Sequence, residues 1–267
     1  MYSKVKTLEL CRQIVKQIQE RIRLAKERGA DLSEERGIGA DKDATLQIDM
    51  IAEEVTLNVL KEGFNGTILT EEKGLEKLGK DEELIIIDPI DGTKNAVRGY
   101  PFYAFVISFY TDLEGKDPYA GYINNLGNND EFFAYQGKTY YNEKSTKTVH
   151  RELKEAGITL IRPTASEHME IIDKIRKNCK FIRISGSAAL DVAYIASGSM
   201  DCFIDFTRGL KTVDYAAAAY ILQCAGGVIT TLRGEKLPIN KDLTKIVNVL
   251  ATGSKELHKK LIKLIAK

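Results

Sequence analysis

The stretch Leu84-Ile85-Ile86-Ile87-Asp88-Pro89-Ile90-Asp91-Gly92-Thr93 joins a run of bulky apolar residues to a short polar turn. Four apolar residues in succession predict a buried strand over residues 84–87. Pro89 has no backbone N–H to give to a neighbouring strand, so we expect the strand to end at Asp88. The strand would therefore bring two carboxylates, Asp88 and Asp91, to one edge of a sheet.

The turn after this strand has the composition of a metal and phosphate site. The carboxylates of Asp88 and Asp91 and the carbonyl of Ile90 are hard oxygen donors, which Mg²⁺ prefers. Gly92 lets the backbone approach a ligand closely, and the free N–H groups that open a short helix at Thr93 favour an anion. Taken alone, the motif is also typical of an ordinary turn in which the two aspartates only cap the following backbone.

Two further carboxylates strengthen the metal interpretation. Glu71 follows a predicted strand over residues 67–70 and could share a metal ion with Asp88, although an isolated Glu-Glu pair is more often a solvated turn. Asp214 stands where a helix begins before a run of alanines. An N-cap there, worth about 1 kcal/mol, explains Asp214 equally well on its own.

Periodicity predicts an α+β first half and an α/β second half. Helices are expected over 3–28 and 47–62, a mobile loop over 36–43, and strands of an antiparallel sheet over 102–110, 119–123 and 131–135. Strands over 157–161, 181–184, 202–206 and 227–231 then alternate with helices over 166–178, 187–198 and 214–225, and a final helix covers 254–266. We expect a soft boundary near residue 150, which divides the chain into lobes 1–150 and 151–267.

Composition excludes several classes of protein. The 267 residues include 39 basic and 38 acidic side chains, for a net charge of +1, which leaves no electrostatic footprint for nucleic acid or a membrane surface. The four cysteines lack a CxxC spacing and the three histidines are scattered, so neither disulfides nor a zinc site are expected. No run of 18 apolar residues is present. We expect a cytoplasmic protein.

Together, these pieces resemble the inositol monophosphatase family of the lithium-sensitive, Mg²⁺-dependent phosphatase superfamily. The matching segments, in chain order, are Glu71-Glu72, Asp88 to Pro101-Phe102, Ala134 to Asn142, Gly186-Ser187-Ala188-Ala189-Leu190, and Asp214 with its alanines. The resemblance implies a layered αβαβα sandwich with an antiparallel N-terminal sheet and a smaller mixed C-terminal sheet. Gly39-Ala40-Asp41 is most similar to the archaeal-type enzymes with both inositol monophosphatase and fructose-1,6-bisphosphatase activity.

The resemblance also implies roles for individual residues. Glu71, Asp88 and the Ile90 carbonyl would bind a first Mg²⁺, Asp88, Asp91 and Asp214 a second, and the region of Glu71 and residues 38–43 a weaker third. The N–H groups of Gly92 and Thr93 would hold the phosphate, and Ser187 and Ala188 would contact the substrate. The Thr93 hydroxyl, oriented by Asp49, would accept the proton of the attacking water that Glu71 positions. Without the resemblance, Asp49 is simply a mid-helix residue facing solvent.

The substrate end departs from the inositol-specific pattern. Thr207 stands where many inositol phosphatases carry a glutamate, and Val213 where tryptophan is usual. Arg208 and Lys211 suit a second phosphate, which favours fructose 1,6-bisphosphate; a basic surface loop is the plainer interpretation. The alternatives are a 3′-phosphoadenosine-type bisphosphate nucleotidase and a non-catalytic regulatory protein on the same fold. The family implies a homodimer.

Overall fold

The computed structural model describes residues 1–161, 167–207 and 209–265. Its helices are α1 (Lys4–Glu27), α2 (Gln47–Lys61), α3 (Thr93–Val97), α4 (Glu167–Asn178), α5 (Ala188–Ala196), α6 (Thr212–Cys224) and α7 (Lys255–Ile265). The first strands are β1 (Glu35–Ile38), β2 (Ala44–Leu46), β3 (Thr67–Thr70), β4 (Gly74–Lys77), β5 (Leu84–Asp91), β6 (Ala104–Tyr110) and β7 (Pro118–Asn125). The later strands are β8 (Glu131–Tyr135), β9 (Lys138–Tyr141), β10 (Lys144–Ser145), β11 (Gly157–Leu160), β12 (Phe181–Arg183), β13 (Cys202–Ile204), β14 (Val228–Thr231) and β15 (Val249–Thr252).

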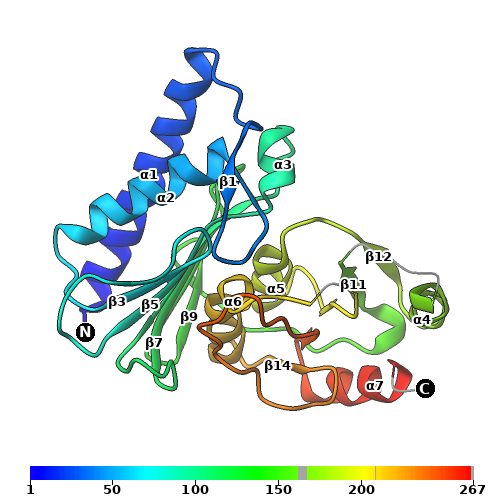
Figure 1. Cartoon of the computed structure of the whole chain (residues 1–267). Helices are drawn as coiled ribbons and strands as arrows, with labels where there is room; N and C mark the ends of the chain where they lie inside the picture. The colour runs from blue at the N-terminus through cyan, green and yellow to red at the C-terminus, as the bar shows by residue number, and fades with distance from the viewer. Residues whose placement is uncertain (162–166, 208, 266–267) are drawn as a thin grey trace.

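Two long helices cover one face of an eight-stranded sheet in the first half of the chain (Figure 1). The strand order is β10-β9-β8-β7-β6-β5-β3-β4. In α1, Cys11, Ile14 and Ile18 are fully buried because they recur on one side of the helix. These side chains share a core with α2 and the sheet.

Strand β5 continues through Pro89, so the prediction that it ends at Asp88 is wrong. The register with β6 shifts between Asp88 and Asp91, and a bulge of this kind tolerates a residue that has no N–H to donate. On its other side β5 pairs in parallel with β3, with Thr70 opposite Ile87. The sheet is therefore not wholly antiparallel, and Glu71 follows the end of β3 beside Asp88 of β5.

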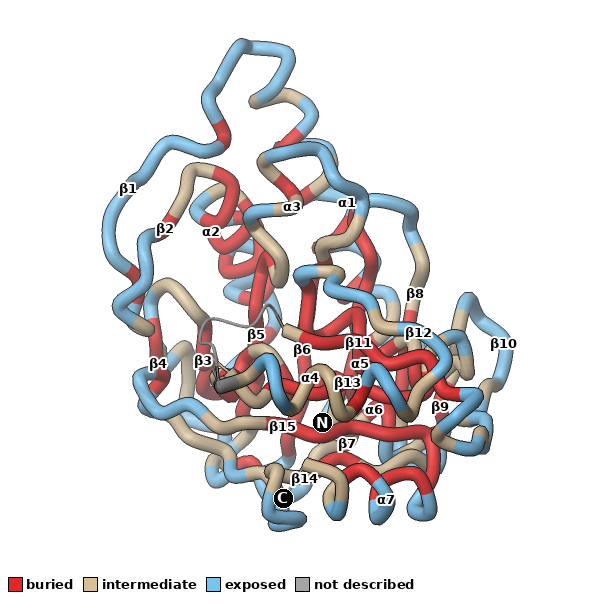
Figure 2. The backbone as a smooth tube through the Cα atoms, turned by 90° about the vertical axis from the view of Figure 1, so that its right-hand side faces the viewer, coloured by how far each residue is buried: buried red, intermediate tan, exposed pale blue. Residues whose placement is uncertain are grey.

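The segment expected to be a loop over residues 36–43 belongs to a two-stranded antiparallel hairpin formed by β1 and β2. All four residues of β1 are exposed (Figure 2). No hydrophobic pattern indicates this pairing, because the hairpin buries little apolar surface of its own. Its turn, residues 39–43, contacts the segment after β3, because Ala40 N–H donates a hydrogen bond to Glu72 O at 2.9 Å.

The second half forms a smaller mixed sheet of five strands in the order β12-β11-β13-β15-β14. Helices α5 and α6 lie between the two sheets, and α4 and α7 cover the outer face (Figure 1). This arrangement confirms the expected αβαβα layers. The first sheet ends at Ser145 and the second begins at Gly157, yet α6 packs on β6 and β7, so the two halves share a core.

No helix in the described part of the chain is both long and apolar enough to cross a membrane.

Candidate active site

The bulge at the end of β5 arranges three of the predicted groups around one turn. Asp88 is 1% exposed, and its Oδ1 accepts a hydrogen bond from Ile90 N–H at 2.9 Å. Gly92 has φ +93°, a left-handed conformation that glycine adopts without strain. The Thr93 hydroxyl lies 2.9 Å from Asp49 Oδ1 and 3.1 Å from Ile90 O. Because it has one proton, it donates to only one of them at a time.

Asp49 is buried rather than facing solvent as a mid-helix aspartate usually does. It is 6% exposed, in the first turn of α2, and its Oδ2 accepts from Leu46 N–H at 3.0 Å. Burial raises the pKa of Asp49 to about 6, against the opposing effect of the hydrogen bonds from Leu46 and Thr93. The structure therefore brings together Asp49 and Thr93, which are 44 residues apart in the chain.

Residues of the second half of the chain bind the carboxylate of Asp91. Its Oδ2 accepts hydrogen bonds from the Ser187 hydroxyl at 2.5 Å and Ala189 N–H at 2.8 Å. Ser187 is also the N-cap of α5, where its hydroxyl accepts from Leu190 N–H. Burial raises the pKa of Asp91 to about 6, although bonds from Ser187, Ala189 and Ala188 act to lower it. The predicted substrate contacts Ser187 and Ala188 thus lie against this carboxylate.

Asp214 and Glu71 complete a concentration of negative charge around Asp88. Burial, followed by repulsion from Asp91, raises the pKa of Asp214 to about 7. Burial and then Asp214 raise the pKa of Glu71 well above its usual range, and burial, Glu71 and Asp91 do the same for Asp88. The structure therefore gathers all four predicted carboxylate ligands, and their excess charge and oxygen chemistry suit Mg²⁺.

Lys211 projects its ammonium group into this cluster, at the start of α6. Its Nζ contacts Asp41 and lies 2.9 Å from Asp43 Oδ2 and 3.1 Å from Glu71 Oε1. Burial tends to lower the pKa of Lys211, but Glu71, Asp41 and Asp214 raise it above its usual range. Among the described residues, no three His, Cys, Asp or Glu side chains are positioned to hold one metal ion.

Three polar residues around the site were missed from the sequence. Asn95 Nδ2 donates to Phe102 O at 2.7 Å and to Ser185 O at 2.8 Å, which ties α3 to the turn before α5. Ser185 in turn donates to the buried carboxylate of Asp191, and Thr70 donates to the buried Glu53. The contact from Asn95 to Ser185 joins segments 90 residues apart, so no local spacing could have predicted it.

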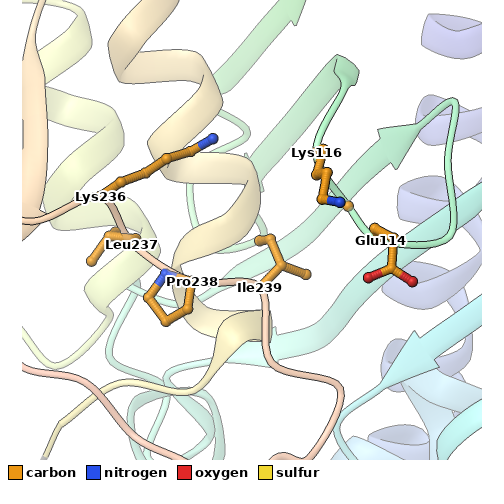
Figure 3. Close-up of a pocket in the computed structure, with 7 residues that line it drawn as sticks. Glu114, Lys116, Lys236, Leu237, Pro238 and Ile239 are labelled. Atoms are coloured by element: carbon orange, nitrogen blue, oxygen red, sulfur yellow. The ribbon is translucent and has the colours of Figure 1, made fainter.

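One predicted substrate contact, Arg208, lies outside the described residues, and one surface hollow lies outside the carboxylate cluster. A hollow of about 360 Å³ (Figure 3) is lined by residues 114–116 of the β6–β7 turn and residues 236–239. Glu71, Asp88, Asp91 and Asp214 do not line this hollow, so it lies apart from the carboxylate cluster.

Comparison with known proteins decides the family. The sequence profile of the inositol monophosphatase family matches residues 4–267. This chain belongs to the inositol monophosphatase family. The resemblance inferred from its motifs is therefore confirmed, and the fold agrees: a solved structure of an inositol monophosphatase–fructose 1,6-bisphosphatase superposes with a TM-score of 0.85 at 29% identity, covering 96% of this chain and 98% of that chain.

Three proteins with similar sequences carry three different functional names. The fructose-1,6-bisphosphatase/inositol-1-monophosphatase of Archaeoglobus fulgidus is 34% identical over 232 residues, 86% of each chain. The bifunctional NADP phosphatase/NAD kinase of Methanococcus maripaludis is 31% identical over 84% of this chain and 43% of that protein. The Nus factor SuhB of Xylella fastidiosa is 32% identical over 73% of this chain and 72% of that protein. The family and most of these names indicate a phosphatase of small phosphorylated molecules.

Proposed function

We propose that this chain is a Mg²⁺-dependent phosphomonoester hydrolase that acts on inositol monophosphate, fructose 1,6-bisphosphate or both. The observation that carries the proposal is the 2.9 Å hydrogen bond from the Thr93 hydroxyl to Asp49, placed beside four clustered carboxylates. A carboxylate whose pKa is about 6 can accept a proton near neutral pH. The fold alone would not distinguish an enzyme from an inactive relative.

The chain's own residues divide the chemistry between them. Glu71, Asp88, the Ile90 carbonyl, Asp91 and Asp214 would hold two Mg²⁺ ions, with a third near Glu71 in reach of the hairpin. Bound Mg²⁺ supplies neutralisation of phosphate charge and acidifies a water molecule.

The proton and the phosphate are then handled by groups around Thr93. The hydroxyl of Thr93 would receive the proton of the attacking water as it passes its own proton to Asp49. Glu71 would orient that water, and the N–H groups of Gly92 and Thr93 would hold the phosphate. Ser187 orients Asp91 through its 2.5 Å hydrogen bond, and we propose that the backbone at Ser187 and Ala188 also borders the substrate.

Bisphosphate preference depends on the cations at the substrate end of the site. Lys211 is engaged by Asp41, Asp43 and Glu71, so it is not available for a distal phosphate in this state. The hypothesis of a second phosphate site then depends on Arg208. The test measures the ratio of activity on fructose 1,6-bisphosphate to activity on inositol monophosphate. If Arg208→Ala leaves this ratio unchanged, the hypothesis is refuted.

A substrate panel tests the main proposal. Phosphate release would be measured with inositol monophosphate, fructose 1,6-bisphosphate, NADP⁺ and 3′-phosphoadenosine 5′-phosphate, each with Mg²⁺ and with EDTA. Thr93→Val should lose turnover at least about a hundredfold, the scale of a lost proton-transfer group. Thr244→Val is the matched control because Thr244 makes the same kind of hydrogen bond, at 2.6 Å, to the exposed Asp242. No Mg²⁺-dependent release from any substrate would refute the proposal.

The same panel decides between the alternatives. The relative that is an NADP phosphatase/NAD kinase favours NADP⁺ as a second candidate substrate. Preferential hydrolysis of the nucleotides would show that they, and not inositol or fructose phosphates, are the substrates. The Nus factor relative favours the alternative of a non-catalytic role, which predicts no phosphate release from any substrate. A cytoplasmic location and a homodimer stay predictions; sedimentation analysis would test the dimer.

A further inference from the structure

Lys211 connects three segments that the sequence separates widely. It stands directly before α6, while Asp41 and Asp43 belong to the β1–β2 hairpin and Glu71 follows β3. The Asp41 side chain is 3% exposed, that of Lys211 15% and that of Glu71 20%. The Asp43 side chain is 59% exposed, so the network is largely buried and reaches the surface at Asp43.

The network has an energetic reason. Carboxylates that lose their water without a partner are costly to bury, and this cluster contains more carboxylates than cations. Within the described residues, Glu71 has Lys211 as its salt-bridge partner. The backbone of the same lysine donates to Asp214 Oδ2 at 2.8 Å. Lys211 is therefore positioned to neutralise the cluster whenever no other cation does so.

The ammonium and a metal ion cannot both use Glu71 fully. Mg²⁺ binds carboxylate oxygens at about 2.0–2.1 Å, and the ammonium is 3.1 Å from Glu71 Oε1. Two cations attached to one carboxylate would lie within a few ångströms of each other and repel strongly in a partly dehydrated site. Loading of a metal at Glu71 would therefore displace or weaken the Lys211 contact.

We propose that Lys211 is the protein's own cation in this site, where it fastens the β1–β2 hairpin to the carboxylate cluster and competes with a metal ion for Glu71. The inference rests on the proposed function, because only there is Glu71 a metal ligand. Metal loading and hairpin attachment are thereby coupled. The hairpin also retains its own contacts to the β3 end, from Ala40 N–H to Glu72 O and from Thr45 to the Glu72 carboxylate.

The test compares metal binding in the wild type, Lys211→Met, Lys211→Arg and Lys260→Met. Methionine keeps the length of the side chain and removes the charge, while arginine keeps the charge. Lys260→Met is the matched control because it removes an ammonium that pairs with Glu152 on the surface, with both side chains about half exposed. The probe is Mn²⁺ added to metal-free protein, with free Mn²⁺ followed by electron paramagnetic resonance. Circular dichroism verifies that each variant is folded.

Lys211→Met should bind Mn²⁺ at least about tenfold more tightly than the wild type, or bind one further ion, since a like charge at close range is removed. Lys211→Arg and Lys260→Met should stay within about twofold of the wild type. If the wild type binds Mn²⁺ and Lys211→Met binds the same number of ions no more tightly, this inference fails and the proposed function is unaffected. If the wild type binds no Mn²⁺, the proposed function fails with it.

A second measurement follows the hairpin directly. Arg36 and Lys42 are exposed residues of the hairpin that trypsin can cleave. Without metal, cleavage there should be several-fold faster in Lys211→Met than in Lys260→Met. Equal cleavage rates in the two metal-free variants would overturn the fastening role of Lys211.

Discussion

Glu53 offers a quantitative test of how burial shapes this site. It lies in α2, is 2% exposed and accepts a hydrogen bond from Thr70 at 2.6 Å. Burial raises its pKa from 4.5 to about 7, with the Thr70 bond opposing and the charge of Glu72 adding to the rise. Glu53→Gln keeps the shape and the acceptor oxygen and removes the charge.

The sign and size of the effect follow from proton linkage. The folded state binds the Glu53 proton more tightly than the unfolded state does, so the free energy of unfolding of the wild type falls as pH rises from 4.5 to about 7. At about 1.4 kcal/mol per pH unit, this loss amounts to about 3 kcal/mol. Glutamine has no charge to bury. Relative to the wild type, the variant should therefore gain up to about 3 kcal/mol between pH 5 and pH 8.

Urea unfolding followed by circular dichroism, repeated at each pH unit from 5 to 8, measures this difference. Glu54→Gln is the matched control, because Glu54 is the exposed neighbour of Glu53 on the same helix; it should change stability by less than about 0.5 kcal/mol at every pH. A difference between Glu53→Gln and the wild type that is the same at pH 5 and pH 8 would refute the reasoning.

Three further substitutions test other parts of the structure. Asp91→Asn should reduce Mg²⁺-dependent phosphate release by at least about a hundredfold with an unchanged circular dichroism spectrum; full activity would remove this residue from the metal site. Gly92→Ala should lower the free energy of unfolding by about 1–2 kcal/mol, since φ is +93° and a Cβ would lie 3.1 Å from Gly186 O; unchanged urea stability would contradict this. Asp201→Asn should cost about 1–3 kcal/mol in the same assay, because the ion pair that Asp201 makes with Arg151 at 2.5 Å loses its charge; a smaller loss would mean that solvent screens the pair.

Local patterns were enough to predict most elements of the fold. The apolar run at 84–87 indicated the central strand, and 3.6-residue periodicity predicted α1 and α2 to within two residues at each end. The strand β15 (Val249–Thr252) was missed. It is fully buried at all four positions, so it lacks the alternation that marks a half-exposed strand, and its Ala251 and Thr252 make it less apolar than the run at 84–87.

Proline rules misplaced the end of β5 for a physical reason. The rule that a central strand stops at proline assumes that every position must donate to a neighbour. Between Asp88 and Asp91 the register shift with β6 removes that demand. The irregularity that defeats the rule lies at the same residues as the predicted metal ligands, where sequence rules are expected to fail.

The candidate site could be assembled only in part from sequence because its geometry depends on packing between the halves. Asp88 lies in β5 and Glu71 follows the paired strand β3, which a sequence can suggest. The partners of Asp91 and Lys211 lie 96 and 170 residues away. Such contacts leave no local periodicity, so Lys211 was expected to contact a distal phosphate, whereas in the structure it contacts Asp41.

The distribution of buried surface implies that the two sheets should not depend on the Lys211 ammonium, whereas the attachment of the hairpin should. Helix α6, which carries Asp214, packs on β6 and β7 through a core that includes the fully buried Tyr215, Ala218 and Ile221. Burial of such side chains contributes about 1–3 kcal/mol each, enough to hold Asp214 against the repulsion of its neighbours. The hairpin has exposed β1 residues and holds to the rest mainly through polar contacts. Removal of the Lys211 ammonium should therefore loosen the hairpin well before it unfolds the sheets.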